Sequence, residues 1–435
     1  MHRACASITL PSFSSSGLSS PAPRLRPACQ ILEYTLVEKP RATRVLNHHT
    51  QSLRRFVAPN TTVDVGRLLR WAPYAPRVSR LLLMLEACMR SEAGRHALEQ
   101  ADVVAERHTL AKLMNQDNKT SRAFNAFFVN GTLFLEEHIP QSKRLKINRT
   151  ATNRRIGFLH ACSELLSGMG ENHTHTFNTV VARSLGGLNV LLGGRVDCVA
   201  TPYTHDPSCY IQLLVDPGNG HYAPTRKRLA FLRALLSDTP TTVIGTIDAS
   251  HILRHTQILS TSALLEAATT PNYQWSLDGS LRFAAHFLST LRDHLQSETD
   301  ALALQQTVGD ARARAIGWGD TGGSSNVWRV ELVPQDLREA ADPVVVVQQL
   351  DADDPSIDRP VVTPELLGSY RRRPPNIGLE VCHGVRTNSE DGRREVWSSS
   401  DAGQSRSRKV CLEFGHQEWS EGPGQGRKLG GLGRP

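Results

Sequence analysis

The sequence predicts a mixed α/β fold in a single domain, with helices and strands intermixed along the chain. Apolar residues recur with a helical period in some runs and concentrate in short β-rich runs in others. Several pairs of β-rich runs are joined by glycine-containing turns rather than by helices. Direct strand-to-strand connections favour an α+β or mixed sheet over a doubly wound parallel one. The 435 residues, 39% of them hydrophobic, are enough to bury a large core.

Helices are expected where apolar residues follow a 3.6-residue period. In the first such run, Leu81, Leu82, Leu85 and Cys88 fall on one face, and the last run is the most strongly amphipathic. The expected helices span residues 79–89, 98–114, 154–167, 226–237 and 280–295.

Strands are expected where β-branched and aromatic residues concentrate between turn signals. The strongest signal is Asn130-Gly131, which separates two apolar runs and predicts a tight hairpin. Gly193-Gly194 is likewise expected to form a turn between two strands. The expected strands span residues 123–129, 132–136, 188–192, 195–200, 209–215, 241–247, 326–332 and 344–349.

Composition divides the chain into a leader at 1–27, a folded domain at 28–350 and a tail at 351–435. The leader lacks Asp and Glu and is rich in Ser, Pro and Arg, which suits a disordered segment or an organellar transit peptide. The tail is rich in Arg, Gly and Ser, above all after Tyr370, and is expected to be disordered. RNA contact and translated non-coding sequence are the alternatives for this tail.

The formal net charge is +8, from 50 Lys and Arg against 42 Asp and Glu, so an anionic partner such as nucleic acid is expected. Two basic clusters are candidate phosphate contacts, although such runs are more often solvated faces. They comprise Lys143, Arg144, Lys146, Arg149, Arg154 and Arg155, and Arg226, Lys227, Arg228 and Arg233. No apolar run reaches the roughly 18 residues that a membrane span needs. The eight cysteines form no C-x-x-C pair, which fits a reducing compartment.

The residues with the clearest chemical pattern follow two neighbouring expected strands. Asp197 lies on the first, and Gln212 and Leu214 share one face of the second because they are two residues apart. Carboxylates on neighbouring strands can hold a divalent ion, and a lysine beside them stabilises charge on an attacked phosphate. The plain structural alternative is that Asp197 stabilises a turn. His173 and His175 are expected to be loop residues rather than metal ligands.

These two strands resemble the G-E-V-D-C … C-Y-x-E-L-K core of the DXO family of RNA-decapping nucleases. Further stretches between about residues 52 and 332 resemble family segments in the same order. They are 101–107, which ends in the family's essential arginine at Arg107, the hairpin 127–136, the stretch 156–165, the dipeptide 178–179, the segment 226–245, and Trp275 with the helix 280–295. The resemblance implies a nuclease-like core of two mixed β-sheets flanked by helices.

The resemblance also implies roles for individual residues. Glu164 and Asp197 would hold a divalent cation, Mg²⁺ or Mn²⁺, with a carbonyl oxygen of Gln212. Arg107 would position the attacked phosphate as a catalytic residue. Arg233, which falls near a glutamine of the family's following helix, would contact the substrate together with Arg107.

Three positions depart from the family pattern. Arg195 replaces the glutamate of E-x-D, Gln212 replaces the glutamate of E-x-K, and Leu214 replaces its lysine. Arg195 removes a ligand and adds a cation, and we expect it to form an ion pair with Asp197 or Glu164 because an unpaired buried charge is too costly.

The resemblance implies a decapping nuclease-family protein that acts on or binds RNA 5′ ends. The family reaction is metal-dependent phosphodiester hydrolysis of incomplete caps or 5′-triphosphates, and the departures predict that it is weak or lost in this chain. The alternative is a catalytically silent scaffold that binds RNA or an exonuclease. A nuclear 5′–3′ exoribonuclease is an implied partner, the nucleus is the implied location with the cytoplasm as an alternative, and no membrane partner is expected. The hypothesis requires Glu164 and Asp197 to lie close together.

Overall fold

The structure of the chain is a computed structural model, which describes a set of ranges with gaps between them. They are residues 5–9, 23–39, 42–47, 52–59, 62–66, 79–115, 121–140, 149–166, 175–216, 224–269, 275–316, 327–333, 344–350, 386–387 and 394–395. The chain divides into two units, 1–378 and 379–435. In the second unit, β17 (Arg386–Thr387) pairs antiparallel with β18 (Arg394–Glu395).

The larger sheet of the first unit has ten strands among the described residues, in the order β1-β16-β15-β6-β7-β5-β10-β9-β2-β3. Most neighbours pair antiparallel, but β5 pairs parallel with both β7 and β10, so the sheet is mixed. Its strands are β1 (Cys5–Thr9), β2 (Cys29–Lys39), β3 (Ala42–Asn47), β5 (Val103–Glu106), β6 (Arg122–Val129), β7 (Thr132–Glu137), β9 (His175–Leu185), β10 (Leu188–Arg195), β15 (Val327–Val333) and β16 (Val344–Gln349).

The smaller sheet has six strands in the same described part, in the order β14-β13-β12-β11-β4-β8. It is mixed as well, because β12 pairs parallel with β13 and antiparallel with β11. Its strands are β4 (Arg54–Phe56), β8 (Ser163–Leu165), β11 (Cys198–Val199), β12 (Tyr210–Asp216), β13 (Thr241–Ile247) and β14 (Leu253–Ser260). The two residues Val196 and Asp197 connect β10 of the larger sheet to β11 of the smaller one.

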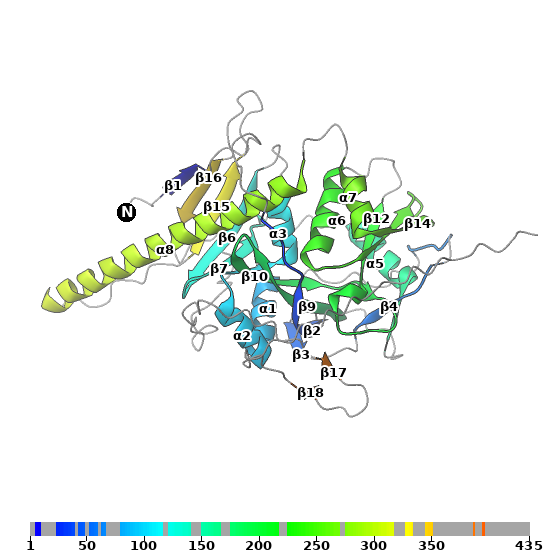
Figure 1. Cartoon of the computed structure of the whole chain (residues 1–435), viewed down its shortest axis with the longest axis horizontal. Helices are drawn as coiled ribbons and strands as arrows, with labels where there is room; N and C mark the ends of the chain where they lie inside the picture. Colours follow the sequence, from blue (N-terminus) through cyan, green and yellow to red (C-terminus); the bar gives the residue numbers. More distant parts are fainter. Residues whose placement is uncertain are drawn as a thin grey trace, which may run out of the picture. The chain divides into compact units, whose positions relative to one another are not determined.

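Helices cover both sheets (Figure 1). They are α1 (Arg80–Met89), α2 (Glu92–Gln100), α3 (Arg107–Met114), α5 (Arg149–Cys162), α6 (Pro224–Leu236), α7 (Thr261–Ala268) and α8 (Leu277–Ile316), with a 3-10 turn, η1, at Pro207–Cys209. Ser79, Ser91 and Ser260 accept hydrogen bonds from first-turn N–H groups of α1, α2 and α7, which fixes where these helices begin.

The larger sheet is buried on both faces. On one face, α1 and α2 pack against Val104 and Leu191. On the other face, α3, α6 and α8 pack against Ala105 and Leu192. Because Val104 and Ala105 are consecutive residues of β5, their side chains point to opposite faces of the sheet. A separate core under α5 joins Phe158 to the smaller sheet.

The Asn130-Gly131 hairpin is confirmed. β6 and β7 pair antiparallel from Val129–Thr132 outward, and both turn residues have positive φ, 50° at Asn130 and 79° at Gly131. Two positive φ values define the tight turn that Asn-Gly favours.

Expected boundaries are wrong around β5 and β10. Residues 98–114 do not form one helix, because Val103–Glu106 is inserted as β5 between β7 and β10 and separates α2 from α3. The Gly193-Gly194 pair is not a turn but lies within β10, and the β9–β10 turn falls at Gly186-Gly187, where φ is 60° and 88°.

The predicted mixed α/β fold, with two mixed sheets flanked by helices, is confirmed. The domain boundaries stay a prediction. The leader contains β1, which pairs with β16, while most of its other residues and nearly all of the tail lie outside the described residues. Within the described part, no helix is long and apolar enough to cross a membrane.

Candidate functional site

Asp197 occupies the connector between the two sheets, and its carboxylate is held by N–H groups from three directions. Its Oδ2 accepts the backbone N–H of Leu213 on β12 at 3.0 Å. Its Oδ1 lies 3.3 Å from Nη2 of Arg155 and 3.4 Å from Nε of Arg195. The Asp197 side chain is 9% exposed, so it is an almost fully buried carboxylate. The expected ion pair between Arg195 and Asp197 is therefore present.

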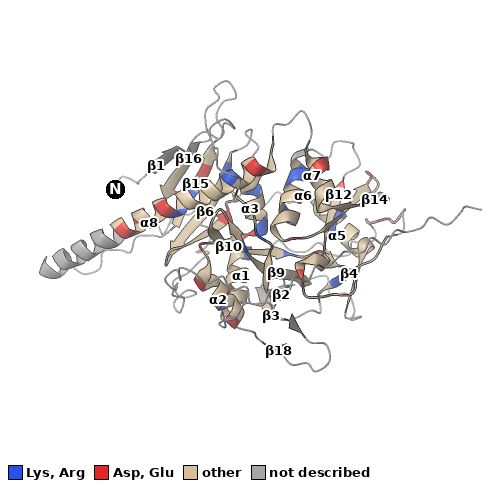
Figure 2. Ribbon diagram, viewed as in Figure 1, with Lys and Arg blue, Asp and Glu red and all other residues tan. Residues whose placement is uncertain are grey.

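Arg107 and Arg233 also interact electrostatically with Asp197. Arg107 is the first residue of α3 and donates to the backbone carbonyl of Arg195. Arg233 comes from the last turn of α6, and its positive charge helps to lower the pKa of Asp197. We call Arg107, Arg155, Arg195 and Arg233 the arginine cluster. Figure 2 shows basic positions on α3, α5 and α6.

The absence of side chains at Gly193 and Gly194 lets Arg107 pack closely against β10. A Cβ atom at Gly194 would lie 2.9 Å from Nε and 3.1 Å from Cζ of Arg107, closer than a side chain tolerates. At Gly193 a Cβ atom would lie 2.2 Å from Sδ of Met84 on α1. The glycine pair therefore lets a helix on one side and an arginine on the other approach the backbone of β10.

The arginine cluster keeps Asp197 ionised. Burial raises the pKa of Asp197, but Arg155, Arg195, the Leu213 N–H and Arg233 together lower it below its usual value. Burial also lowers the pKa of His108 to about 2, with Lys112, Arg233 and Arg155 adding to the effect. Asp197 therefore interacts electrostatically with all four members of the arginine cluster.

Gln212 and Leu214 of β12 both contact α6. Nε2 of Gln212 donates to the carbonyl of Ala230 on α6 at 3.2 Å. Leu214 is 6% exposed and packs in the core with Ala230 and Ile244. The Leu at this position therefore serves packing between the smaller sheet and α6.

Glu164 is not brought to Asp197. The expected helix ends at Cys162, and Glu164 lies in β8 at the edge of the smaller sheet. Its Oε2 is 2.8 Å from Nη2 of Arg55 on β4, and its side chain is 56% exposed. β4 separates β8 from β11, the strand that follows Asp197.

The residues present do not fit the divalent cation that the family resemblance implies. Mg²⁺ and Mn²⁺ need several oxygen ligands, mostly carboxylates and carbonyls. The Asp197 oxygens are engaged by N–H donors, and the carboxylates of Glu164 and Asp197 have separate arginine partners. Within the described ranges, no group of three or more His, Cys, Asp and Glu side chains could hold a metal ion.

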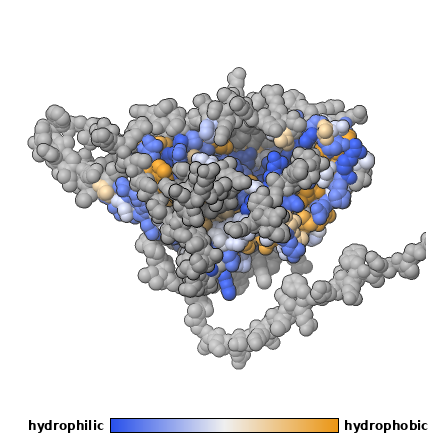
Figure 3. Space-filling view, turned by 90° about the horizontal axis from the view of Figure 1, so that it is seen from above, coloured by the Kyte–Doolittle hydropathy of each residue, from blue (hydrophilic) through white to orange (hydrophobic). Residues whose placement is uncertain are grey.

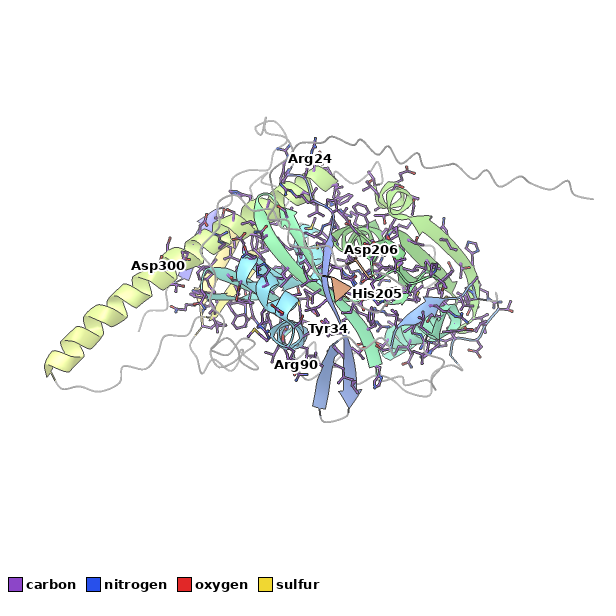
Figure 4. All side chains as sticks on the ribbon, turned by 60° about the horizontal axis from the view of Figure 1, so that its bottom comes forward. Arg24, Tyr34, Arg90, His205, Asp206 and Asp300 are labelled. Atoms are coloured by element: carbon purple, nitrogen blue, oxygen red, sulfur yellow. The ribbon has the colours of Figure 1, made fainter. Side chains whose placement is uncertain are left out.

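A polar network fixes the loop that follows β11. His205 Nδ1 lies 3.1 Å from Glu33 Oε1, and the Tyr203 hydroxyl donates to the same oxygen (Figure 4 labels His205). The Tyr210 hydroxyl, at the start of β12, donates to Gln30 Oε1. These contacts tie the segment between β11 and β12 to β2 and so support the position of Leu213 against Asp197.

The structure places the two sequence-predicted basic clusters only in part. Arg155 of the first cluster and Arg233 of the second both belong to the arginine cluster. Lys143, Arg144 and Lys146 lie outside the described residues. Sequence reasoning did not single out Arg155 as a site residue, because a basic run gives no signal for which member turns toward a buried carboxylate. On the face shown in Figure 3, hydrophilic residues cover most of the described surface.

A family model described as RAI1 like PD-(D/E)XK nuclease matches residues 27–162 and 163–321. This chain belongs to the RAI1-like nuclease family. The predicted kinship with the DXO family of RNA-decapping nucleases is confirmed. The matched residues include α3, the connector and β12, which carry Arg107, Asp197 and Gln212. No curated protein sequence matches the chain significantly.

Solved RAI1-like structures share the fold at low sequence identity. Rai1 of Scheffersomyces stipitis, in complex with (3'-NADP)+ and calcium ion, has a TM-score of 0.59 at 14% identity, covering 83% of this chain and 99% of that one. Candida albicans Rai1, in complex with pU5-Mn2+, has a TM-score of 0.57 at 11% identity over 83% and 98%. K. lactis Dxo1, in complex with manganese, has a TM-score of 0.53 at 11% identity over 80% and 99%.

Proposed function

We propose that this RAI1-like chain binds RNA 5′ ends and has lost ordinary metal-dependent phosphodiester hydrolysis. The observation that carries the proposal is the state of Asp197, whose Oδ1 lies 3.3 Å and 3.4 Å from two arginines. A carboxylate engaged in this way is a poor cation ligand, because the cation would have to displace both guanidinium groups. Family membership and the RNA ligand of the Candida albicans relative support RNA as the ligand class.

Two other positions support the loss of hydrolysis. Glu164 is paired with Arg55 at the edge of the smaller sheet rather than with Asp197. Leu214, at the position where the family pattern has a lysine, is buried among apolar side chains and offers no charge to a reacting phosphate. Among the described residues, the site therefore lacks the family's set of carboxylates and the lysine beside them.

The proposal is tested by incubating the purified full chain with 5′-triphosphate RNA and with incompletely capped RNA in Mn²⁺. We expect RNA binding by fluorescence anisotropy but no release of the terminal group. The control is Asp197→Ala, assayed in parallel. Cleavage by the wild type that disappears in Asp197→Ala would show an active metal-dependent hydrolase, and absence of RNA binding would refute the binding half of the proposal.

A combined variant tests whether the three departures from the family pattern alone explain the loss of hydrolysis. Restoring the family residues by Arg195→Glu, Gln212→Glu and Leu214→Lys leaves Glu164 on β8, so we expect little or no gain of cleavage. Strong cleavage by this variant alone would mean that the three substitutions account for the whole loss.

A nuclear 5′–3′ exoribonuclease as partner and a nuclear location are separate proposals that rest on family membership alone. Co-purification of the tagged full chain with an exoribonuclease from a nuclear extract would support both. Recovery of the chain from the cytoplasm without such a partner would count against both.

A further inference from the structure

We infer that the arginine cluster is a metal-independent binding site for the terminal 5′-phosphate of RNA, in which Asp197 occupies the arginines until the phosphate displaces it. The inference rests on the proposed RNA 5′-end binding and names the chemistry that performs it. Arg155 and Arg195 both contact the Asp197 carboxylate, and Arg107 donates to the backbone carbonyl of Arg195. Several guanidinium groups gathered at one carboxylate attract an oxyanion rather than a cation.

The existing ion pairs of Asp197 Oδ1 are long. Charge-assisted N–H···O contacts are usually about 2.7–2.9 Å long. The contacts of Asp197 Oδ1 with Arg155 and Arg195 are 3.3 Å and 3.4 Å, whereas Arg55 and Glu164 reach 2.8 Å at the sheet edge. Asp197 Oδ1 therefore contacts these two guanidinium groups at longer than usual distances, and an incoming phosphate has three oxygens with which to contact them more closely.

Arg155 and Arg195 are both accessible from solvent. The Arg155 side chain is 52% exposed and Arg195 is 19% exposed, so the ligand can reach both without unfolding the core. Arg155 stands on α5, which packs on the smaller sheet, and Arg195 ends β10 of the larger sheet. A phosphate between them would contact both guanidinium groups, and arginine forks bind phosphate oxygens in pairs.

The backbone of β12 fixes the position of the Asp197 carboxylate. Its Oδ2 is bound to the Leu213 N–H at 3.0 Å, so the carboxylate stays in place when Oδ1 loses its arginine partners. A resident carboxylate of this kind competes with the ligand for the same donors. Removing its charge while keeping its shape should therefore strengthen phosphate binding. If Asp197 instead held a metal ion that binds the phosphate, the same change would weaken phosphate binding.

The test measures anisotropy of a labelled oligonucleotide that carries a 5′-phosphate or a 5′-hydroxyl, in EDTA and in Mn²⁺. We expect the 5′-phosphate form to bind more tightly in EDTA, with Mn²⁺ giving no gain. Asp197→Asn should tighten binding about fivefold, because one competing negative charge is removed. Arg155→Gln should weaken it about tenfold, the usual loss of one contact to a charged group.

The matched control is Arg254→Gln. Arg254 is 55% exposed and paired with Asp248, much as Arg155 is paired with Asp197, but it lies on β14 at the far edge of the smaller sheet. It should leave the phosphate preference unchanged. Thermal unfolding of each variant confirms that it is folded.

The two proposals fail in distinguishable ways. Binding that requires Mn²⁺, equal binding of the two 5′ ends, or weaker binding by folded Asp197→Asn would overturn the metal-independent site while RNA binding itself stands. No RNA binding under either condition would overturn the proposed function and this inference together.

Discussion

Glu106 is a carboxyl group with unusual chemistry beside the site. It is half-buried at the end of β5, next to Arg107. Burial raises its pKa to about 7, and the neighbouring Glu136 and Glu137 add to the effect while Arg80 and Arg107 oppose it. The folded protein therefore holds a proton at Glu106 that the unfolded chain releases at lower pH.

This proton makes stability fall as pH rises. Between the ordinary value of 4.5 and about 7 the native state binds more protons than the unfolded state, so the free energy of unfolding decreases over that window. The full effect of this group is on the order of 3 kcal/mol. We expect Glu106→Gln to remove this slope, measured by urea unfolding at about pH 5 and about pH 8. If the free energy of unfolding changed between the two pH values by the same amount in Glu106→Gln as in the wild type, the raised pKa of Glu106 would be contradicted.

Single residues were predictable where their chemistry is local. The pairing of Arg195 with Asp197 follows from their separation of two residues and the cost of an unpaired buried charge. The partner of Glu164 was not predictable, because it depends on β4, a three-residue strand about a hundred positions earlier. Short sequence patterns do not encode such a long-range pairing.

At the scale of elements, Asp102 fixes the long helix α8 against the larger sheet. Its Oδ1 accepts from Nη1 of Arg292 on α8 at 2.9 Å, and its Oδ2 accepts the Asn189 N–H on β10 at 2.8 Å. The residue is 7% exposed. Figure 1 shows α8 running across this sheet and extending beyond it.

We expect Asp102→Ala to lower the free energy of unfolding by about 2–3 kcal/mol, because a buried N–H and a partly buried guanidinium lose their acceptor. The comparison is Glu86→Ala, which breaks the exposed Glu86–Arg90 pair one helical turn apart and should cost about 0.5 kcal/mol or less. Urea unfolding of both variants measures the difference. If both variants lost the same free energy of unfolding, the buried contacts of Asp102 would contribute no more than an exposed ion pair.

Elements were predictable where turn chemistry or helical period is strong. Asn130-Gly131 fixes its hairpin by φ preference alone. The helical period located α1 but not all of its buried face, because Leu81, Leu85 and Cys88 are buried as expected whereas Leu83 and Met84 are buried in place of Leu82. β5 was missed because Val103–Glu106 is a short apolar run between two helices, and periodicity cannot separate such a run from a buried helix. Gly193-Gly194 was misread as a turn because close approach by Arg107 and Met84 leaves the same signature in sequence.

At the scale of the first unit, Arg183 joins segments far apart in the chain. Its side chain is 3% exposed, and it reaches Asp238 Oδ1 at 2.9 Å, the carbonyl of Arg26 at 2.8 Å and the carbonyl of Leu235. Asp238 Oδ2 also accepts the Ala28 N–H at 2.5 Å. The segment before β2 is thereby attached to β9 and to the end of α6.

We expect Arg183→Gln to release that segment and to destabilise the fold by about 3 kcal/mol or more, since Asp238 loses its buried partner. Limited trypsin digestion followed by mass spectrometry should show faster cleavage after Arg24, the site in this segment that no proline follows. Arg95→Gln, on the exposed face of α2, should digest like the wild type. Unchanged cleavage in Arg183→Gln would mean that the segment is held by other contacts.

The Val196–Asp197 connector has a mechanical consequence. It joins two sheets that carry different members of the arginine cluster, Arg195 on one and Arg155, through α5, on the other. A ligand that contacted both guanidinium groups would link the two sheets at this connector, so local opening of the connector would be coupled to ligand binding. Saturating ligand should accordingly slow amide exchange at the connector and at the strand ends beside it.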